Sequence, residues 1–163
     1  MSTSASHLAS HQARAVADIS EGLVLASVEI AAPPERVFQA LTSSEICNWW
    51  VRPGVMDTRE WSGEVRVGGR WRASGIGNGR PYVLEGEYLE IDPPRKLVHT
   101  WEPVGAPGQP STVTYLLEPT SKGTKITLRH AGIAVPDICT NTSIAWETSF
   151  ARLAEIFTER LGS

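Results

Sequence analysis

The sequence predicts an α+β fold, in which a curved antiparallel sheet of about seven strands wraps around one long C-terminal helix. Three observations lead to this prediction. Residues 141–161 carry large apolar side chains at helical spacing, residues 57–130 alternate between strand patterns and turn signals, and no helical pattern interrupts those strands. Consecutive strands joined by short turns run antiparallel, so we expect one strand, two short helices, a six-strand meander and a long helix.

Length and composition fit one globular domain. The chain has 163 residues, of which 41% are hydrophobic and 20% charged, and its formal net charge is -3. We expect residues 1–20, which are rich in Ser and Ala, to form a flexible tail and residues 21–163 to form a single domain. The slightly acidic balance, without a run of Lys or Arg, argues against binding to nucleic acid or to a membrane surface.

The cysteines and the tail histidines carry no recognisable site. Cys47 and Cys139 are far apart and belong to no CxxC or Cys/His cluster, which suits a reducing compartment. The chain also lacks an 18-residue apolar run and a signal-peptide pattern, so we expect a cytoplasmic protein. His7 and His11 have a spacing that can place two metal ligands on one helix face, but without a third ligand nearby we expect no metal site.

The first structural segment is a strand followed by two short helices. Residues 21–31 are rich in aliphatic and β-branched side chains that alternate with polar ones, and Pro34 suits the first position of a helix. The segment Thr42–Glu45 matches a capping box, which predicts that a second helix begins at once and carries Trp49 and Trp50. Adjacent side chains cannot share one helix face, so we expect one Trp in the core and the other at a groove rim or the helix end, packed there or in contact with a ligand.

The meander is a series of strand patterns separated by turns that contain Gly, Pro or Asn. Gly68-Gly69 predicts a two-residue hairpin turn after the first of these strands. The expected strands are 57–67, 70–74, 82–91, 96–101, 111–117 and 124–130. An antiparallel sheet of this kind can have one dry face, which needs a cover.

The C-terminal helix provides that cover. Its apolar stripe consists of Trp146, Phe150, Leu153, Phe157 and Leu161. Large rings on one face need a broad apolar partner, and the sheet is the element able to supply it. A strongly curved sheet around one helix leaves a gap wherever side chains do not fill the space between them, and we interpret that gap as the natural ligand site.

Alternation along the strands predicts which side chains reach this gap. His99 and Trp101 share one face of their strand, and Tyr115 and His130 lie on corresponding faces of theirs. A hydrophobic pocket with a few fixed polar groups is typical of small-molecule sites. The residues expected to line the pocket are Trp50, Trp71, Tyr88, His99, Trp101, Tyr115, His130, Trp146 and Phe150. The alternative is that these rings fill core volume.

Catalytic candidates are few. His99 and His130 are possible general acids or bases because histidine titrates near neutral pH, although an isolated strand histidine is more often structural. A cyclase-type reaction would need His or Tyr beside a carboxylate or Arg, and Arg72, Glu85 and Glu87 qualify only by their location in strands. The sequence contains no GxSxG, HExxH or phosphate-binding loop. We therefore assign no catalytic residue and expect no metal and no cofactor.

Several local motifs recur in one known family. They are Ala32–Leu41, Trp49-Trp50, Val67–Trp71, Gly86–Ile91, Pro94–Leu97, Thr100-Trp101, Gly123–Leu128 and His130–Gly132. With the order of elements, they resemble the helix-grip fold of the START-like or birch-pollen-allergen-like superfamily (SRPBCC), and within it the branch named after the activator of heat-shock protein 90 ATPase homologue. One departure is Ala145-Trp146, where many relatives open the last helix with Gly-Trp.

The resemblance spans about residues 22–161 and implies a cavity-bearing fold whose members bind apolar ligands and include some enzymes. We carry three hypotheses. The first is a protein that binds a small hydrophobic ligand, such as a lipid, a polyketide or another aromatic molecule, between the sheet and the C-terminal helix. The second is a cyclase or dehydratase on the same scaffold, and the third is a chaperone-associated interaction module. The expected partners are a small hydrophobic ligand and, in addition, a chaperone or a second copy of the chain.

Overall fold

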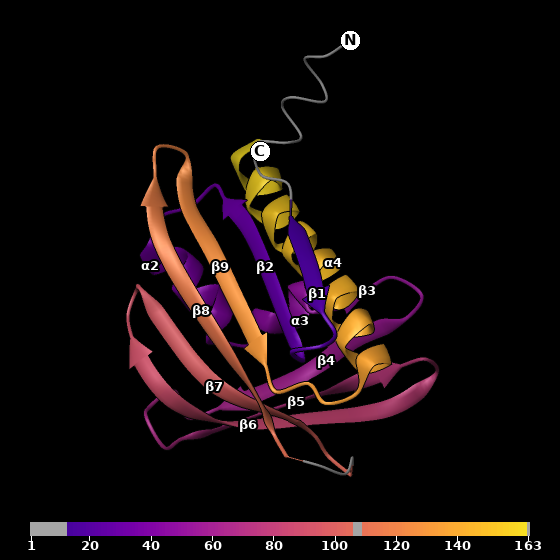
Figure 1. Cartoon of the computed structure of the whole chain (residues 1–163). Helices are drawn as coiled ribbons and strands as arrows, with labels where there is room; N and C mark the ends of the chain where they lie inside the picture. Colours follow the sequence, from indigo (N-terminus) through magenta and orange to yellow (C-terminus); the bar gives the residue numbers. More distant parts are fainter. Residues whose placement is uncertain (1–12, 106–108, 163) are drawn as a thin grey trace.

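A nine-stranded antiparallel sheet curls around the C-terminal helix in the part of the chain that the structure describes (Figure 1). This computed structural model describes residues 13–105 and 109–162, with side chains up to Glu159. The strand order across the sheet is β1-β2-β9-β8-β7-β6-β5-β4-β3. The predicted helix-grip architecture is confirmed, with two strands more than the sequence pattern indicates.

The elements follow the predicted order. The strands are β1 (Arg14–Asp18), β2 (Leu23–Ile30), β3 (Val51–Arg52), β4 (Met56–Gly63), β5 (Arg70–Gly77), β6 (Arg80–Asp92), β7 (Lys96–Pro103), β8 (Ser111–Thr120) and β9 (Gly123–Ala131). The helices are α2 (Pro34–Leu41), α3 (Ile46–Trp49) and α4 (Pro136–Gly162). The two strands not predicted are β1 and the two-residue β3, which pairs with the start of β4.

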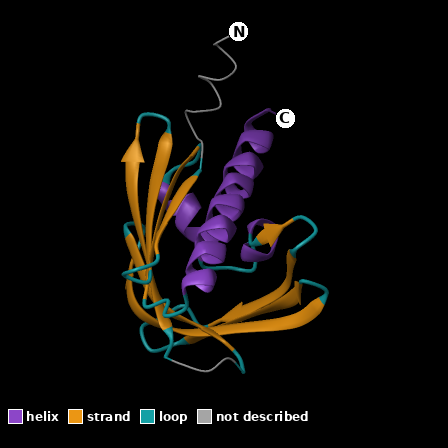
Figure 2. Cartoon of the chain, turned by 45° about the vertical axis from the view of Figure 1, so that its right-hand side comes forward, coloured by secondary structure: helices purple, strands orange, loops and turns teal. Residues whose placement is uncertain are grey.

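The sheet is strongly bent, and α4 lies on the inside of the bend (Figure 2). Register shifts occur between Thr58 and Glu60 in β4 and between Tyr88 and Glu90 in β6. Such bulges insert an extra residue on one strand and increase its local twist. They lie in the half of the sheet that turns under α4, so they help the concave face to surround the helix.

The helix packs into this concave face through its predicted stripe. Trp146, Phe150, Leu153 and Phe157 are all buried, which confirms the helical periodicity, whereas the side chain of Leu161 lies outside the described residues. The helix begins at Pro136, earlier than predicted. Proline suits the first turn of a helix, because the backbone N–H that it lacks would have no intrahelical acceptor there. The stripe therefore forms one wall of the core and the sheet forms the other.

The prediction of a flexible tail over residues 1–20 is wrong for its second half. Residues 14–18 form β1, which pairs with β2 along its whole length. Ala13 is buried, and Ala15 and Ala17 pack against the core, so small alternating side chains are enough to dock a strand on an existing sheet edge. The helix covers this edge strand, since the Ala15 N–H donates to Glu147 Oε1 at 3.2 Å. Residues 1–12, including His7 and His11, lie outside the described residues.

Two local predictions are also wrong. The capping box does not form: Glu45 is the N-cap of α3 without a side-chain cap bond, and its carboxylate instead pairs with Arg36 at 2.7 Å. Gly68-Gly69 does not form a two-residue hairpin either, because β4 ends at Gly63 and a longer loop leads to β5. In that loop the Gly68 N–H donates to the Tyr88 carbonyl at 2.9 Å, so the loop is anchored to β6 rather than folded tightly on itself.

Candidate functional site

One continuous group of rings lies between the sheet and α4. Its members are linked by ring contacts with centroids 5.0 to 6.4 Å apart. They are Trp49, Trp50, Trp71, Tyr88, His99, Trp101, Tyr115, His130, Trp146 and Phe150. We call this group the aromatic cluster. It contains all nine residues that the sequence predicts for a pocket, together with Trp49.

Strand alternation and one glycine place these rings. Trp71 faces Gly86 across the β5–β6 pair, and a Cβ at Gly86 would lie 2.3 Å from Trp71 Nε1 and 2.1 Å from the Thr100 carbonyl oxygen. The indole therefore lies over β6 in space that only glycine leaves open. On α3, Trp49 Nε1 donates to the Ala40 carbonyl at 3.0 Å, which fixes its ring against α2.

Trp49 and Trp50 are both buried, so the expectation that only one enters the core is wrong, whereas the expectation that the other lies at the end of the helix is confirmed for Trp50. Trp49 is 1% exposed and Trp50 3% exposed. The chain leaves the helical conformation at Trp50, which is the C-cap of α3, and this change of direction allows adjacent side chains to point inward. The Trp50 carbonyl is held by the Thr58 hydroxyl at 2.7 Å, and the Tyr82 hydroxyl bonds to the same Thr58 oxygen.

Two polar groups inside the cluster lack partners. Among the described residues, nothing bonds to the buried indole nitrogens of Trp50 and Trp71. Burial raises the pKa of the Tyr88 and Tyr115 hydroxyls, so both phenols are protonated at neutral pH. The interior of the cluster thus brings many rings into contact but is incompletely hydrogen bonded.

His99 is held as a neutral ring within this interior. Its Nδ1 lies 2.8 Å from the Thr100 carbonyl oxygen, which can only accept, so Nδ1 carries the proton. Burial lowers its pKa to about 4, while the Thr100 carbonyl acts weakly in the opposite direction. At neutral pH His99 is therefore an uncharged core side chain.

His130 belongs to a chain of hydrogen bonds at the edge of the cluster. Its Nδ1 accepts from Trp146 Nε1 at 3.1 Å, and its Nε2 lies 2.7 Å from Ser111 Oγ. The Ser111 hydroxyl in turn donates to the Trp101 carbonyl at 3.2 Å. Burial, with a smaller effect of neighbouring His99, lowers the pKa of His130 to about 3, so this ring is also neutral.

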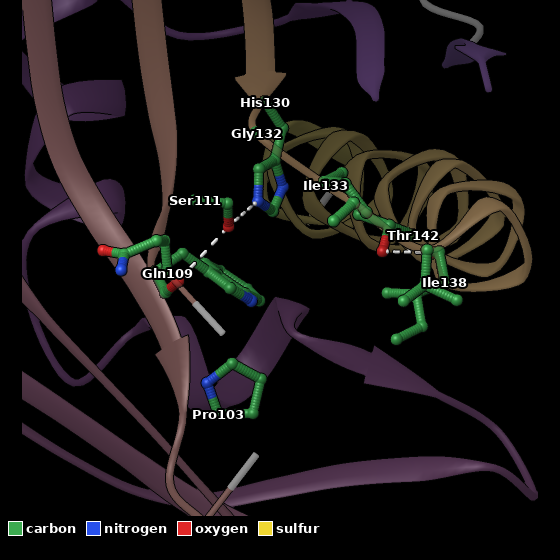
Figure 3. Close-up of a pocket in the computed structure, with 11 residues that line it drawn as sticks. Pro103, Gln109, Ser111, His130, Gly132, Ile133, Ile138 and Thr142 are labelled. Atoms are coloured by element: carbon green, nitrogen blue, oxygen red, sulfur yellow. Dashed lines mark hydrogen bonds between the residues drawn. The ribbon is translucent and has the colours of Figure 1, made fainter. Parts of the chain in front are cut away.

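A cavity of about 150 Å³ opens beside this chain, between the ends of β7, β8 and β9 and the beginning of α4. Figure 3 shows Ser111 and His130 pointing toward each other on one side, with Ile133, Ile138 and Thr142 across from them. The lining residues are Trp101, Pro103, Gln109, Ser111, His130, Gly132, Ile133, Ala134, Val135, Ile138 and Thr142. We call this volume the rim cavity.

The predicted pocket residues divide into two groups. Trp101 and His130 line the rim cavity. The other seven contribute to the packed interior of the aromatic cluster, where Trp50, Trp71 and Trp146 are each 3% exposed. In this part of the molecule, the alternative that tryptophans fill core volume describes them best.

The charged candidates do not approach either group. Arg72 and Glu85 form an ion pair at 2.8 Å, with side chains that are 57% and 31% exposed. In β6, Glu85 and Glu87 alternate with the buried residues Leu84 and Tyr88, so they face outward. Their outward direction therefore does not support the cyclase-type site for which their location in strands made them candidates.

Sequence reasoning missed most of the lining of the rim cavity. Ser111 precedes Val113 and Tyr115 at the two-residue spacing of an inward face, so extending the alternation to the first residue of β8 would have found it. Gly132 to Val135 lie in the connection from β9 into α4, where neither strand nor helix periodicity predicts side-chain direction. Ile138 lies in the first turn of α4, which begins before the predicted helix of residues 141–161.

Other site types find no support in the described residues. They include no group of three or more His, Cys, Asp or Glu side chains placed to hold a metal ion. No helix in the ranges 13–105 and 109–162 combines the length and apolarity needed to cross a bilayer.

Comparison with known proteins identifies relatives of this arrangement. Residues 31–158 match the model of the family described as Activator of Hsp90 ATPase homolog 1-like protein. No curated protein matches the chain significantly.

Solved structures match the fold over most of the chain. Protein CV1439 from Chromobacterium violaceum is 26% identical, with 83% of this chain and 96% of that one covered and a TM-score of 0.74. Protein Ms6760 from Mycobacterium smegmatis is 18% identical, with coverage of 90% and 97% and a TM-score of 0.75. The AHSA1 protein SPO3351 from Silicibacter pomeroyi is 20% identical, with coverage of 85% and 99% and a TM-score of 0.71.

Proposed function

The chain belongs to the Activator of Hsp90 ATPase homolog 1-like protein family, and from this premise and the site geometry we propose that it binds a small hydrophobic molecule in the rim cavity. The observation that carries the proposal is the cavity itself: a concave volume with mostly apolar walls and a few fixed polar groups. Small-molecule sites usually have this composition.

The mouth of the cavity supports the same proposal. Val135 is 49% exposed and Ile138 is 54% exposed, and both line the cavity. Contiguous exposed apolar side chains are characteristic of binding surfaces, whereas scattered ones are ordinary. An apolar ligand would cover these side chains and remove them from water.

The volume limits the size of the ligand. A cavity of about 150 Å³ with apolar walls is large enough to hold benzene. We therefore propose a ligand whose buried part is about one ring or a short aliphatic segment. Any larger lipid or polyketide would extend past Val135 and Ile138 into solvent.

The hydrogen-bond direction favours binding over nucleophilic catalysis. A catalytic Ser–His pair requires the serine proton to move to an unprotonated histidine nitrogen. Here Nδ1 of neutral His130 accepts from Trp146, so the proton is on Nε2 and the Ser111 oxygen is the acceptor. The described lining residues also include no Asp, Glu, Lys or Arg that would reorganise this chain. The cyclase alternative has no positioned acid or base here.

Toluene is a suitable first probe. Titration with toluene should shift the indole N–H resonance of Trp101, which lines the cavity, in an NMR spectrum. Ile138→Gln should weaken binding several-fold because it places an amide at the apolar mouth. Ile144→Gln is the matched control: Ile144 is 41% exposed on the same helix but is not part of the lining.

The outcomes separate the hypotheses. Equal binding by both variants would place the ligand elsewhere. Absence of any shift with toluene, combined with a concentration-dependent increase in mass or direct association with a chaperone, would favour an interaction module over a ligand-binding protein.

A further inference from the structure

We propose that the rim cavity selects ligands that carry a hydrogen-bond donor, such as a hydroxyl or amine on a single ring. Its inner wall presents hydroxyl oxygens that can only accept, because each of these hydroxyls already donates its proton to a backbone carbonyl. This inference rests on the proposed function and specifies the ligand class of the same cavity. It follows from the direction of each hydrogen bond around Ser111 and Thr142.

The direction is set first by Trp146. An indole N–H can only donate, so the His130 Nδ1 atom that it contacts at 3.1 Å must accept. A neutral histidine then carries its single proton on Nε2, which donates to Ser111 Oγ at 2.7 Å. Burial keeps His130 neutral at physiological pH, since it lowers the pKa of the ring to about 3.

The Ser111 hydroxyl proton is used as well. It donates to the Trp101 carbonyl oxygen at 3.2 Å, and a carbonyl has no proton to return. A serine oxygen accepts up to two hydrogen bonds, of which His130 supplies one. One lone pair of Ser111 is left to meet a donor from a ligand in the cavity.

The second hydroxyl in the lining follows the same rule. Thr142 donates to the Ile138 carbonyl within the first turns of α4, at 2.6 Å, so it also presents only lone pairs. The backbone N–H of Ile133 is bonded to the Gly22 carbonyl at 3.0 Å. Gln109, whose amide offers both donors and an acceptor, is exposed at the outer edge. The hydroxyl groups in the lining thus favour a ligand that carries a donor.

The side chains of the lining disfavour anionic ligands. A carboxylate or phosphate would bring acceptor oxygens against these lone pairs, and the described lining residues include no cationic side chain to balance the charge. A neutral phenol or aniline combines a ring of the right size with a single donor. Phenol is therefore the simplest ligand of the proposed class.

Three ring probes of similar size test this assignment. Phenol carries a donor, anisole carries the same oxygen without the proton, and toluene has neither. We expect phenol to bind roughly three- to tenfold more tightly than anisole or toluene, which is the effect of one neutral hydrogen bond. The measurement is the chemical-shift titration of the Trp101 indole, with the ring nitrogens of His130 followed in the same samples.

Ser111→Ala provides the matched variant. It removes the acceptor and leaves the His130 Nε2–H facing the cavity, so the preference should reverse and anisole should gain over toluene. Thr148→Val removes a hydroxyl with the same kind of intrahelical bond, to the Ile144 carbonyl at 2.9 Å, but Thr148 does not line the cavity, so this variant should leave the preference for phenol intact. If Ser111→Ala does not fold, the His130 nitrogen shifts of the wild type still report whether Nε2 carries the proton.

The possible results are distinguishable. Equal affinity for phenol, anisole and toluene would overturn the donor preference but leave a hydrophobic cavity. If Thr142→Val loses the preference for phenol and Ser111→Ala keeps it, the assignment of the acceptor to Ser111 is wrong. A His130 proton on Nδ1 would also overturn it. No binding of any of the three probes would overturn the proposed function itself.

Discussion

The interior of the aromatic cluster and the rim cavity share residues but differ in packing and in hydrogen bonding. Around Trp50 and Trp71 the space is filled by rings, yet two buried indole nitrogens have no partner in the described part of the chain. Around Ser111 and His130 every hydrogen-bonding group considered above is oriented, yet about 150 Å³ is left open. The rings of the cluster are closely packed around unpaired donors, whereas the rim cavity combines open volume with a lone pair of Ser111 left for a ligand.

This difference supports the proposal that a ligand binds in the rim cavity. An unpaired donor among packed rings lowers stability. A cavity with directed polar groups offers both volume and selectivity. The two regions meet at Trp146, which contacts Trp50 with centroids 6.4 Å apart and donates to His130. Substitution at Trp146 should therefore disturb both.

The largest effect is expected for Trp146→Ala. The side chain is 3% exposed and packs against Trp101, Tyr115 and Phe150. Its loss should lower the free energy of unfolding by about 3–5 kcal/mol, with a further contribution from the unpaired His130 nitrogen. Urea denaturation measures this change.

Trp61→Ala is the control for that experiment. Trp61 lies in β4, is only partly buried and is not a member of the aromatic cluster, so it should lose clearly less stability. A loss at Trp146 no larger than that at Trp61 would mean that the stripe of α4 does not form the centre of the core.

The sequence predicted the fold well because the relevant patterns are periodic. Trp146 and Phe150 follow the helical period, and His99, Tyr115 and His130 follow the strand period, so their inward direction could be inferred. The strand β1 was missed because its inward-facing side chains, Ala15 and Ala17, are small, and its stability depends on the edge of β2 and on Glu147.

The same reasoning could not separate core from cavity. Periodicity gives the direction of a side chain but not the volume left beside it, which depends on how rings from different elements interlock. Gly86, for example, permits Trp71 to lie over β6, and no local pattern reports that contact. The cavity formed instead beside the irregular connection from β9 to α4.

An intermediate effect is expected from acidification, which protonates histidines in both regions. His99 and His130 have folded pKa values of about 4 and about 3, below the value of 6.5 of an exposed histidine. The folded state binds protons less readily than the unfolded state. The contribution of these histidines to stability is therefore fully present above pH 6.5 and is lost as the pH falls toward their pKa values in the folded state. Between pH 7 and pH 5, each histidine should lower the free energy of unfolding by about 2 kcal/mol.

Chemical denaturation at several pH values checks this expectation. His99→Gln should reduce the loss between pH 7 and pH 5 by about half, whatever its effect on stability at pH 7. A pH dependence unchanged by this substitution would show that His99 is not held neutral in the core.

The smallest effect, and the most direct comparison of the two regions, comes from Trp146→Phe and Trp71→Phe. Both substitutions remove the same atoms from side chains that are 3% exposed. Trp146→Phe also removes the donor to His130 Nδ1, whereas Trp71→Phe removes an N–H that has no partner among the described residues. We expect Trp146→Phe to be less stable than Trp71→Phe by about 1–3 kcal/mol in urea denaturation, since leaving a buried acceptor unpaired is costly.

Trp50→Phe tests whether this difference reflects pairing rather than position. Its indole nitrogen also lacks a described partner and its ring is equally buried, so its loss of stability should match that of Trp71→Phe. If all three variants lose the same stability, the bond from Trp146 to His130 contributes nothing beyond packing. The proton on His130 would then not be fixed by Trp146, and the donor preference of the rim cavity would lose its origin.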